Sequence, residues 1–144
     1  MTYPTSLVWF RRDLRDFDHA ALYHALKSSP KVYCAFIFDT EILDQLTDKA
    51  DRRVEFLWES VRELKAALQA SGGDLLVRHA PASSAIPALA SELGVAAVFS
   101  NQDYEPSAIE RDRRVAEALE KQGIDFLQFK DQVIFEKDEV LTQA

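Results

Sequence analysis

Short apolar segments alternate with longer amphipathic segments along this 144-residue chain, and this alternation limits the possible folds more than any other feature. Each short segment is apolar almost throughout and is bounded by polar residues or glycine, which is typical of strands covered on both faces. The longer segments carry apolar residues at spacings of three and four, as amphipathic helices do. The expected strands are Leu7–Phe10, Lys31–Phe38, Leu75–Arg78, Ala96–Ser100 and Asp125–Phe129.

Helices are expected in the segments between these strands. They run from Asp18 to Lys27, Asp51 to Ala70, Ser83 to Leu93 and Tyr104 to Gln122, and Asp18 is expected to cap the first. Gly94 and Gly123 follow the last two as helix stops. The order βαβαβαβαβ predicts an α/β fold. It is a five-stranded, doubly wound parallel sheet of Rossmann type, with strand order 3-2-1-4-5 and helices on both faces.

Length and composition predict a single folded domain spanning residues 1–144. The hydrophobic fraction is 47% and the net charge is −7, so the overall basic footprint of a nucleic-acid binder is absent. The single cysteine, Cys34, lies in an apolar run and is expected to be a buried, inert thiol in a reducing compartment. Neither a membrane span nor a signal peptide is evident, and we expect a cytoplasmic protein without membrane contact.

Common nucleotide-binding and metal-binding motifs are missing. The chain holds four glycines and neither a G-x-G-x-x-G nor a G-x-x-x-x-G-K-[ST] pattern. The segment Ser71–Asp74 looks like a phosphate loop, but it follows an expected helix instead of opening one, so we interpret it as a helix stop. The three histidines are scattered, and no metal site is expected.

The first polar cluster comes directly after the first strand, where Arg11, Arg12 and Arg15 surround Asp13. One interpretation is a loop whose charges pair with one another. The other is a pocket for an anion or a ring system, because open α/β sheets bind ligands at the carboxyl ends of their strands. Guanidinium groups grip carboxylates and stack on flat rings.

A second polar segment, from Ser100 to Pro106, begins at the carboxyl end of the fourth strand. Strand exit and helix capping would explain it without any ligand. In the predicted strand order the first and fourth strands flank the switch point. Arg11, Arg12, Asn101 and Glu105 are then expected to face each other across one crevice.

These two segments resemble the N-terminal signatures of the DNA photolyase and cryptochrome family. The resemblance covers essentially the whole chain with its spacing kept. It rests on Leu7–Arg15, Asp39, Ile42-Leu43, Arg53–Leu57, Asn101–Pro106, Gly123-Ile124, Lys130–Ile134 and Glu139–Thr142. Members usually carry Asp-Asn-Pro where this chain has Asp18, His19 and Ala20, which we interpret as a variant helix cap.

The resemblance implies the N-terminal α/β domain, which carries a light-harvesting antenna chromophore. A helical domain that binds FAD and UV-damaged DNA is expected to follow Thr142, so this chain is expected to hold no catalytic residue. The intact protein would be a deoxyribodipyrimidine photo-lyase, which splits pyrimidine dimers with light and reduced FAD. This chain alone is expected to be inactive.

The resemblance also indicates the type of antenna. Folate-binding members carry Asn-Glu soon after the Tyr-Glu, where this chain has Ser107 and Ala108. The residues that deazaflavin-binding members use are matched by Arg53 at the start of the long helix, by Ile37 after the second strand, and by Asp103 and Arg111. A deazaflavin or FMN antenna is therefore expected in preference to folate.

Two other functions remain open at this stage. A cryptochrome blue-light receptor shares this domain with photolyases almost completely. A stand-alone nucleotide-binding module, of the universal-stress or electron-transfer-flavoprotein type, has the same strand order as the one predicted here. Such a module is not expected to contain both the Phe10–Arg15 and the Asn101–Pro106 strings.

Overall fold

The computed structural model describes residues 3–40 and 52–130, and for residues 52–54 it describes the backbone only. Five strands alternate with the helices in the expected order. The elements are β1 (Thr5–Phe10), α1 (Ala20–Ser28), β2 (Lys31–Asp39), α3 (Arg52–Ala70), β3 (Leu76–Ala80), α4 (Ala82–Leu93), β4 (Ala97–Asn101), α5 (Pro106–Lys121) and β5 (Asp125–Phe129). The matched segments Ile42-Leu43, Asp131–Ile134 and Glu139–Thr142 lie outside the described residues.

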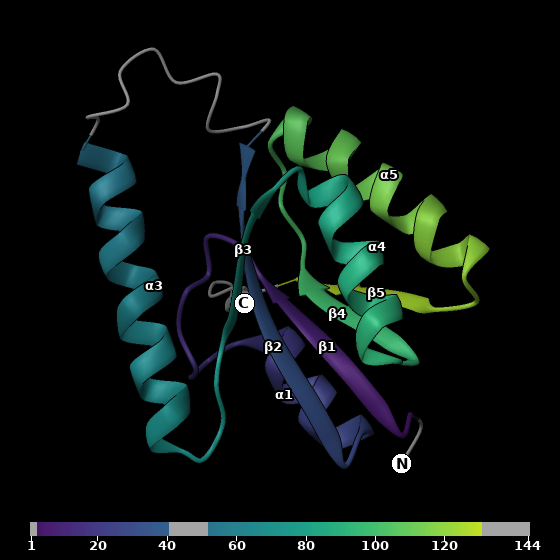
Figure 1. Cartoon of the computed structure of the whole chain (residues 1–144), viewed down its shortest axis with the longest axis horizontal. Helices are drawn as coiled ribbons and strands as arrows, with labels where there is room; N and C mark the ends of the chain where they lie inside the picture. Colours follow the sequence, from purple (N-terminus) through teal and green to yellow (C-terminus); the bar gives the residue numbers. More distant parts are fainter. Residues whose placement is uncertain (1–2, 41–51, 131–144) are drawn as a thin grey trace, which may run out of the picture.

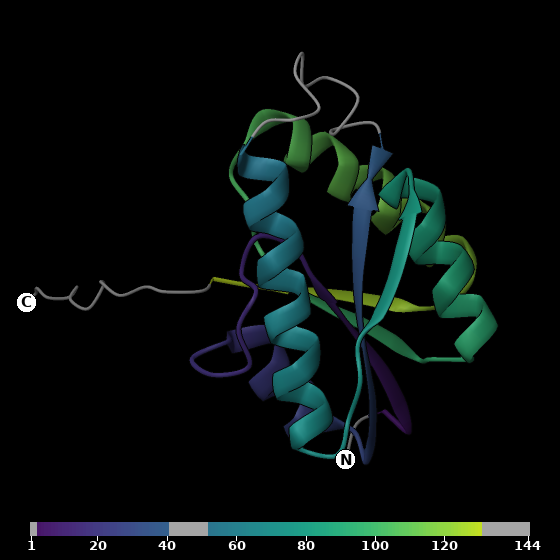
Figure 2. The ribbon, with the colours of Figure 1, turned by 60° about the vertical axis from the view of Figure 1, so that its left-hand side comes forward.

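The strands form one parallel sheet in the order β3-β2-β1-β4-β5, which confirms the predicted topology. Helices α1 and α3 cover one face of the sheet, and α4 and α5 cover the other (Figures 1 and 2). This arrangement follows from right-handed crossovers, because the chain moves outward from β1 to β3 over one face and returns over the other.

Alternation along the strands divides the core into two layers. In β1, Val8 and Phe10 pack toward α1 and α3, whereas Leu7 and Trp9 pack toward α4 and α5. The same alternation in β2 sends Ile37 to the layer of Trp9. Since side chains alternate along a strand, residues just past the end of β1 and β2 continue into one layer or the other.

The start of α1 differs from the sequence prediction. The capping residue is His19, whose Nδ1 accepts a hydrogen bond from the backbone N–H of Leu22 at 3.1 Å. Asp18 has a φ of 48° and cannot take the extended backbone that a capping residue needs. Capping preference favours aspartate over histidine, and the course of the preceding loop overrode that preference.

Two other local predictions, the turn at Ser71–Asp74 and the burial of Cys34, are confirmed. The Ser71–Asp74 segment is a turn after α3, in which the N–H of Gly73 donates to the carbonyl of Leu68 at 2.7 Å. Cys34 is buried, and burial raises the pKa of its thiol to about 12. No helix in the described ranges is long and apolar enough to cross a bilayer.

Candidate functional site

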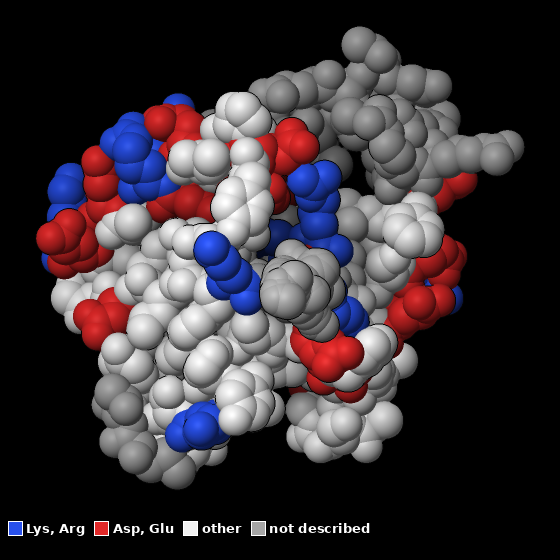
Figure 3. All heavy atoms as spheres, turned by 180° about the vertical axis from the view of Figure 1, so that it is seen from behind, with Lys and Arg blue, Asp and Glu red and all other residues white. Residues whose placement is uncertain are grey.

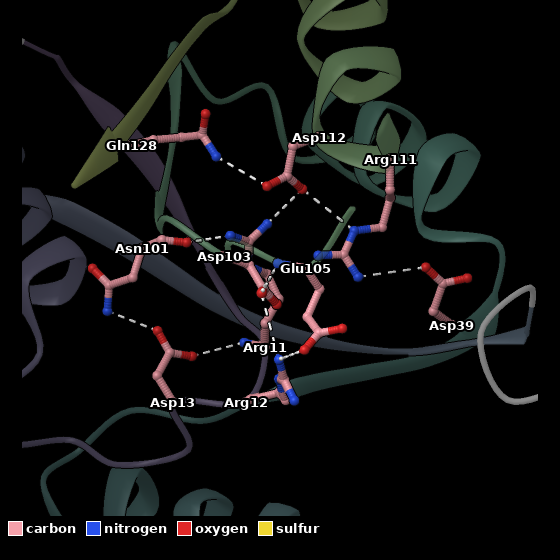
Figure 4. A network of polar contacts seen from close by, with 10 residues as sticks. All are labelled: Arg11, Arg12, Asp13, Asp39, Asn101, Asp103, Glu105, Arg111, Asp112 and Gln128. Carbon is pink, nitrogen blue, oxygen red and sulfur yellow. Dashed lines mark hydrogen bonds and ion pairs between the residues drawn. The ribbon is translucent and has the colours of Figure 1, made fainter. Parts of the chain in front are cut away.

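The polar residues of the site gather where β1 and β4, which are neighbours in the sheet, reach their carboxyl ends. The loop after β1 leads to α1 on one face, and the loop after β4 leads to α5 on the other. The two loops therefore separate at the switch point, as predicted. Figure 4 shows their side chains meeting there, together with Asp39 from the end of β2.

Arg11 is buried at the centre of this region, with its side chain 6% exposed. Its Nη1 donates to Oδ1 of Asp112 at 2.6 Å, and its Nη2 donates to the backbone carbonyl of Asn101. Burial lowers the pKa of Arg11, as does the nearby guanidinium of Arg111, while Asp112 opposes the shift. Arg11 thus joins the end of β1 to α5 and to the end of β4.

Asp112 connects three elements of the fold. Besides Arg11, its carboxylate accepts hydrogen bonds from Nε of Arg111 at 3.3 Å and from Nε2 of Gln128 at 3.0 Å. Of these three donors, Arg11 directly follows β1, Arg111 lies in α5, and Gln128 lies in β5 (Figure 4). A carboxylate bound by two guanidinium groups and an amide has its lone pairs well satisfied, which is the condition for burying a charge.

Arg111 lies between Asp112 and the end of β2. Its Nη1 is 3.7 Å from Oδ2 of Asp39, and its side chain is 10% exposed. Its guanidinium carbon lies 5.0 Å from the centre of the Trp9 ring, and that of Arg11 lies 4.6 Å from the same centre. Nη2 of Arg111 is buried and has no hydrogen-bond partner in the described part of the chain. One strong donor of this site therefore lacks an acceptor.

A second buried cluster ties the loop after β1 to the start of α1. Oδ2 of Asp13 accepts from Nδ2 of Asn101 at 2.7 Å and lies 2.8 Å from Nε2 of His19. Because Nδ1 of His19 accepts from Leu22, the proton of the neutral ring is on Nε2 and points at Asp13. Burial raises the pKa of Asp13, but the bonds from His19, the Arg11 backbone and Asn101 outweigh burial and lower it.

Arg12 behaves differently from its neighbour. Its side chain is 71% exposed, and its Nη2 lies 3.5 Å from Asp103 and 3.6 Å from Glu105. These contacts join the two loops across the outer edge of the site. Asp103 is only 16% exposed, and its Oδ1 also accepts the backbone N–H of Glu105 at 3.1 Å.

The model of the DNA photolyase family matches residues 6–144. The chain belongs to this family. It is 38% identical, over 94% of its length, to a deoxyribodipyrimidine photo-lyase of Synechococcus sp. (strain ATCC 27144). It is also 41% identical, over 99% of its length, to an uncharacterised 31.6 kDa protein of Synechococcus sp. (strain PCC 6716). The chain spans 28% and 50% of these two relatives.

Solved structures of the photolyase family have the same fold. A cryptochrome of Synechocystis sp. PCC6803 superposes with a TM-score of 0.83 and 29% identity, covering 90% of this chain and 28% of that one. An archaeal photolyase from Sulfolobus tokodaii superposes with a TM-score of 0.78 and 30% identity, covering 88% and 29%. The chain is the N-terminal α/β domain of the family, and the alternative of a universal-stress or electron-transfer-flavoprotein module is set aside.

The candidate site residues named from the sequence differ in where the structure places them. Arg11 and Asn101 are buried and engaged in holding the fold. Arg12, Asp103 and Glu105 form the outer ion pairs, and Arg111 lies deeper. Ile37 lies inside β2, not after it, and its buried side chain belongs to the core layer of Trp9. The side chain of Arg53 lies outside the described part of the chain.

Sequence reasoning missed Asp112 and Gln128. A signal for Asp112 was present in α5, because it falls at the spacing of the buried residues Ala108, Val115 and Leu119. A charged residue on the apolar face of a helix indicates a buried partner. Gln128 carries no comparable signal. Within the described residues, no group of three or more His, Cys, Asp or Glu side chains is placed to hold a metal ion.

Proposed function

We propose that this chain binds a flavin-type light-harvesting chromophore at the carboxyl ends of β1, β2 and β4, as the antenna domain of a DNA photolyase. The observation that carries the proposal is the buried Nη2 of Arg111, a strong donor that no atom of residues 3–40 or 52–130 satisfies. An acceptor atom on a bound ring would satisfy it. When bound, the chromophore absorbs light and passes the excitation energy to FAD.

The protein contributes binding and orientation. Asp103, largely buried at the edge of the site, supplies a carboxylate for a polar ring edge, and Arg111 supplies a hydrogen-bond donor. Arg53, at the start of α3, is proposed as a second cation on the basis of the family pattern. Ile37 is proposed to support the site from the core layer beneath it. The Sulfolobus photolyase structure is itself described as implying a novel light-harvesting cofactor.

A folate antenna is less well supported. Folate-binding members of the family carry Asn-Glu at the positions of Ser107 and Ala108. Ala108 is buried against the sheet and has no polar side-chain atom. This chain therefore lacks the carboxylate that would hold a pterin at that place.

Fluorescence titration of the 144-residue chain tests the proposal. Deazaflavin, riboflavin or FMN should bind more tightly than methenyltetrahydrofolate. Arg53→Ala should weaken flavin binding by about 1–3 kcal/mol, the scale of one lost charge-assisted contact. Arg62→Ala is the matched control, because Arg62 lies in the same helix and pairs only at the surface with Glu59. Tighter binding of the folate, or equal effects of the two substitutions, would contradict the proposal.

For the whole protein we propose photolyase activity, with FAD and damaged DNA bound by the part of the family fold that this chain does not span. The cryptochrome photoreceptor is the second candidate, supported by the close superposition of the Synechocystis cryptochrome. On the drawn face, acidic and basic side chains alternate, notably along α5, without forming a broad basic surface (Figure 3). With a net charge of −7, this chain alone should bind DNA no tighter than about 10⁻⁵ M at physiological salt.

A repair assay tests the division of roles. The 144-residue chain, illuminated with dimer-containing DNA and added reduced FAD, should split no dimers. Measurable splitting, or submicromolar DNA affinity in an anisotropy titration, would contradict the assignment of repair to the rest of the family fold.

A further inference from the structure

Four charged side chains with little exposure form a continuous chain through the site. Asp39 contacts Arg111, Arg111 contacts Asp112, and Asp112 contacts Arg11. Each of the four is at most 10% exposed. Two guanidinium groups and two carboxylates alternate along this chain, so their formal charges cancel (Figure 4).

The contacts of Arg111 leave one donor for a ligand. Nε donates to Asp112 at 3.3 Å, and Nη1 lies 3.7 Å from Asp39, so two carboxylates hold the guanidinium at two of its nitrogens. Trp9 lies against its face. Nη2 is the buried nitrogen that has neither a hydrogen bond nor an ion pair with any residue that the structure describes. Because the guanidinium is planar, fixing two of its nitrogens also fixes the direction of the third.

This charge balance restricts what Nη2 can bind. An anionic group placed there would add a charge that these four side chains do not compensate, because their two guanidinium groups already face carboxylates, and burying such a charge is costly. A neutral carbonyl oxygen accepts the same hydrogen bond without changing the net charge.

We propose that Asp112 is the residue that positions Arg111, and that together they select the neutral carbonyl edge of a flat ring over an anionic group. This inference rests on the proposed function and specifies the chemistry of the same site. The ring of riboflavin or FMN meets the requirement, and a ring carbonyl bound at Nη2 would leave the phosphate of FMN away from Arg111. Asp112 acts through Arg111 and touches no ligand atom itself.

The test compares riboflavin with FMN, which differ by one phosphate, in titrations of the 144-residue chain. In the wild type the two dissociation constants should agree within about threefold, since a solvated phosphate gains only a weak ionic contact. Inorganic phosphate should not displace either ligand. If neither flavin binds, the proposed function fails. If FMN binds tenfold or more tightly than riboflavin, or phosphate competes, the function stands and this inference is wrong.

Asp112→Asn removes one carboxylate while keeping the shape of the side chain. It should weaken riboflavin binding and shift the preference toward FMN by about tenfold, because a buried guanidinium that lacks one counter-charge then binds the phosphate of FMN in place of a neutral ring carbonyl. Glu110→Gln makes the same change of charge at an exposed position of α5 and should leave the preference unchanged.

Asp39→Asn, which removes the other carboxylate, should shift the preference in the same direction. Asp39→Asn serves as the test variant if Asp112→Asn does not fold. An unchanged ratio of affinities would overturn the proposal, because general destabilisation does not change a ratio.

Discussion

Arg11 and Arg12 are adjacent in the sequence, yet the structure uses them in opposite ways. The side chain of Arg11 is 6% exposed and bonds to a buried carboxylate and a strand carbonyl. The side chain of Arg12 is 71% exposed and reaches two carboxylates at 3.5 and 3.6 Å. Arg11 continues the alternation of Leu7 and Trp9 and reaches Asp112 of α5, whereas Arg12 points outward to the loop after β4.

This contrast shows that a cluster of charges at strand ends combines two roles. The inner contacts, made by Arg11 and Asp112, hold the ends of β1, β4 and β5 against α5. Losing one partner lowers the free energy of unfolding strongly, because a buried charge is left unpaired. The outer contacts, made by Arg12 with Asp103 and Glu105, are solvated ion pairs, which contribute little to stability. Arg111, whose Nη2 is proposed to bind the ligand, donates to Asp112 of the inner contacts and depends on them for its position.

Arg11→Leu is expected to have the largest effect on the inner zone. It leaves the Asp112 carboxylate buried with less compensation, and it should lower the free energy of unfolding by about 3–5 kcal/mol. Urea denaturation followed by circular dichroism measures the loss. The double variant Arg11→Leu with Asp112→Leu should lose less stability than the sum of the losses of Arg11→Leu and Asp112→Leu. The reason is that the two charges of this buried pair then disappear together. Additive losses would show that the pair is not coupled.

Asp13→Asn should have an intermediate effect, about 1–3 kcal/mol, because one oxygen of Asp13 accepts from Asn101 and contacts His19, the other accepts the backbone N–H of Arg11, and an amide has only one accepting oxygen. Since the pKa of Asp13 is lowered in the folded state, its carboxylate stabilises the protein above its unfolded-state pKa. That stabilisation is lost as the pH falls through the folded-state pKa. The difference in stability between wild type and variant should therefore be full at neutral pH and shrink below about pH 4. A difference independent of pH would show that the charge of Asp13 does not matter.

Arg12→Leu should have the smallest effect, less than about 1 kcal/mol, since exposed ion pairs contribute little. The same urea titration used for Arg11→Leu gives the comparison directly. A loss as large as that of Arg11→Leu would mean that the two arginines are equivalent, and the distinction between inner and outer zones would then be wrong.

The fold could be predicted closely from the sequence because its signals are local. Continuous apolar runs mark the strands, three-and-four spacing marks the helices, and a right-handed, doubly wound arrangement of these elements has the strand order 3-2-1-4-5. Capping was predicted less well, since His19 and not Asp18 caps α1. Capping depends on the backbone angles of the preceding loop, and the sequence pattern does not contain them.

For the site, the sequence by itself determined which residues arrive at the carboxyl ends of β1 and β4, and that they arrive from two facing loops. Only the tertiary structure decided that Arg11 is buried while Arg12 is exposed, and that Asp112 links Arg11, Arg111 and Gln128. Sequence patterns report which face of an element a residue occupies. The partner of a buried charge comes from elements far apart in the chain, and it is determined only when the layers pack together.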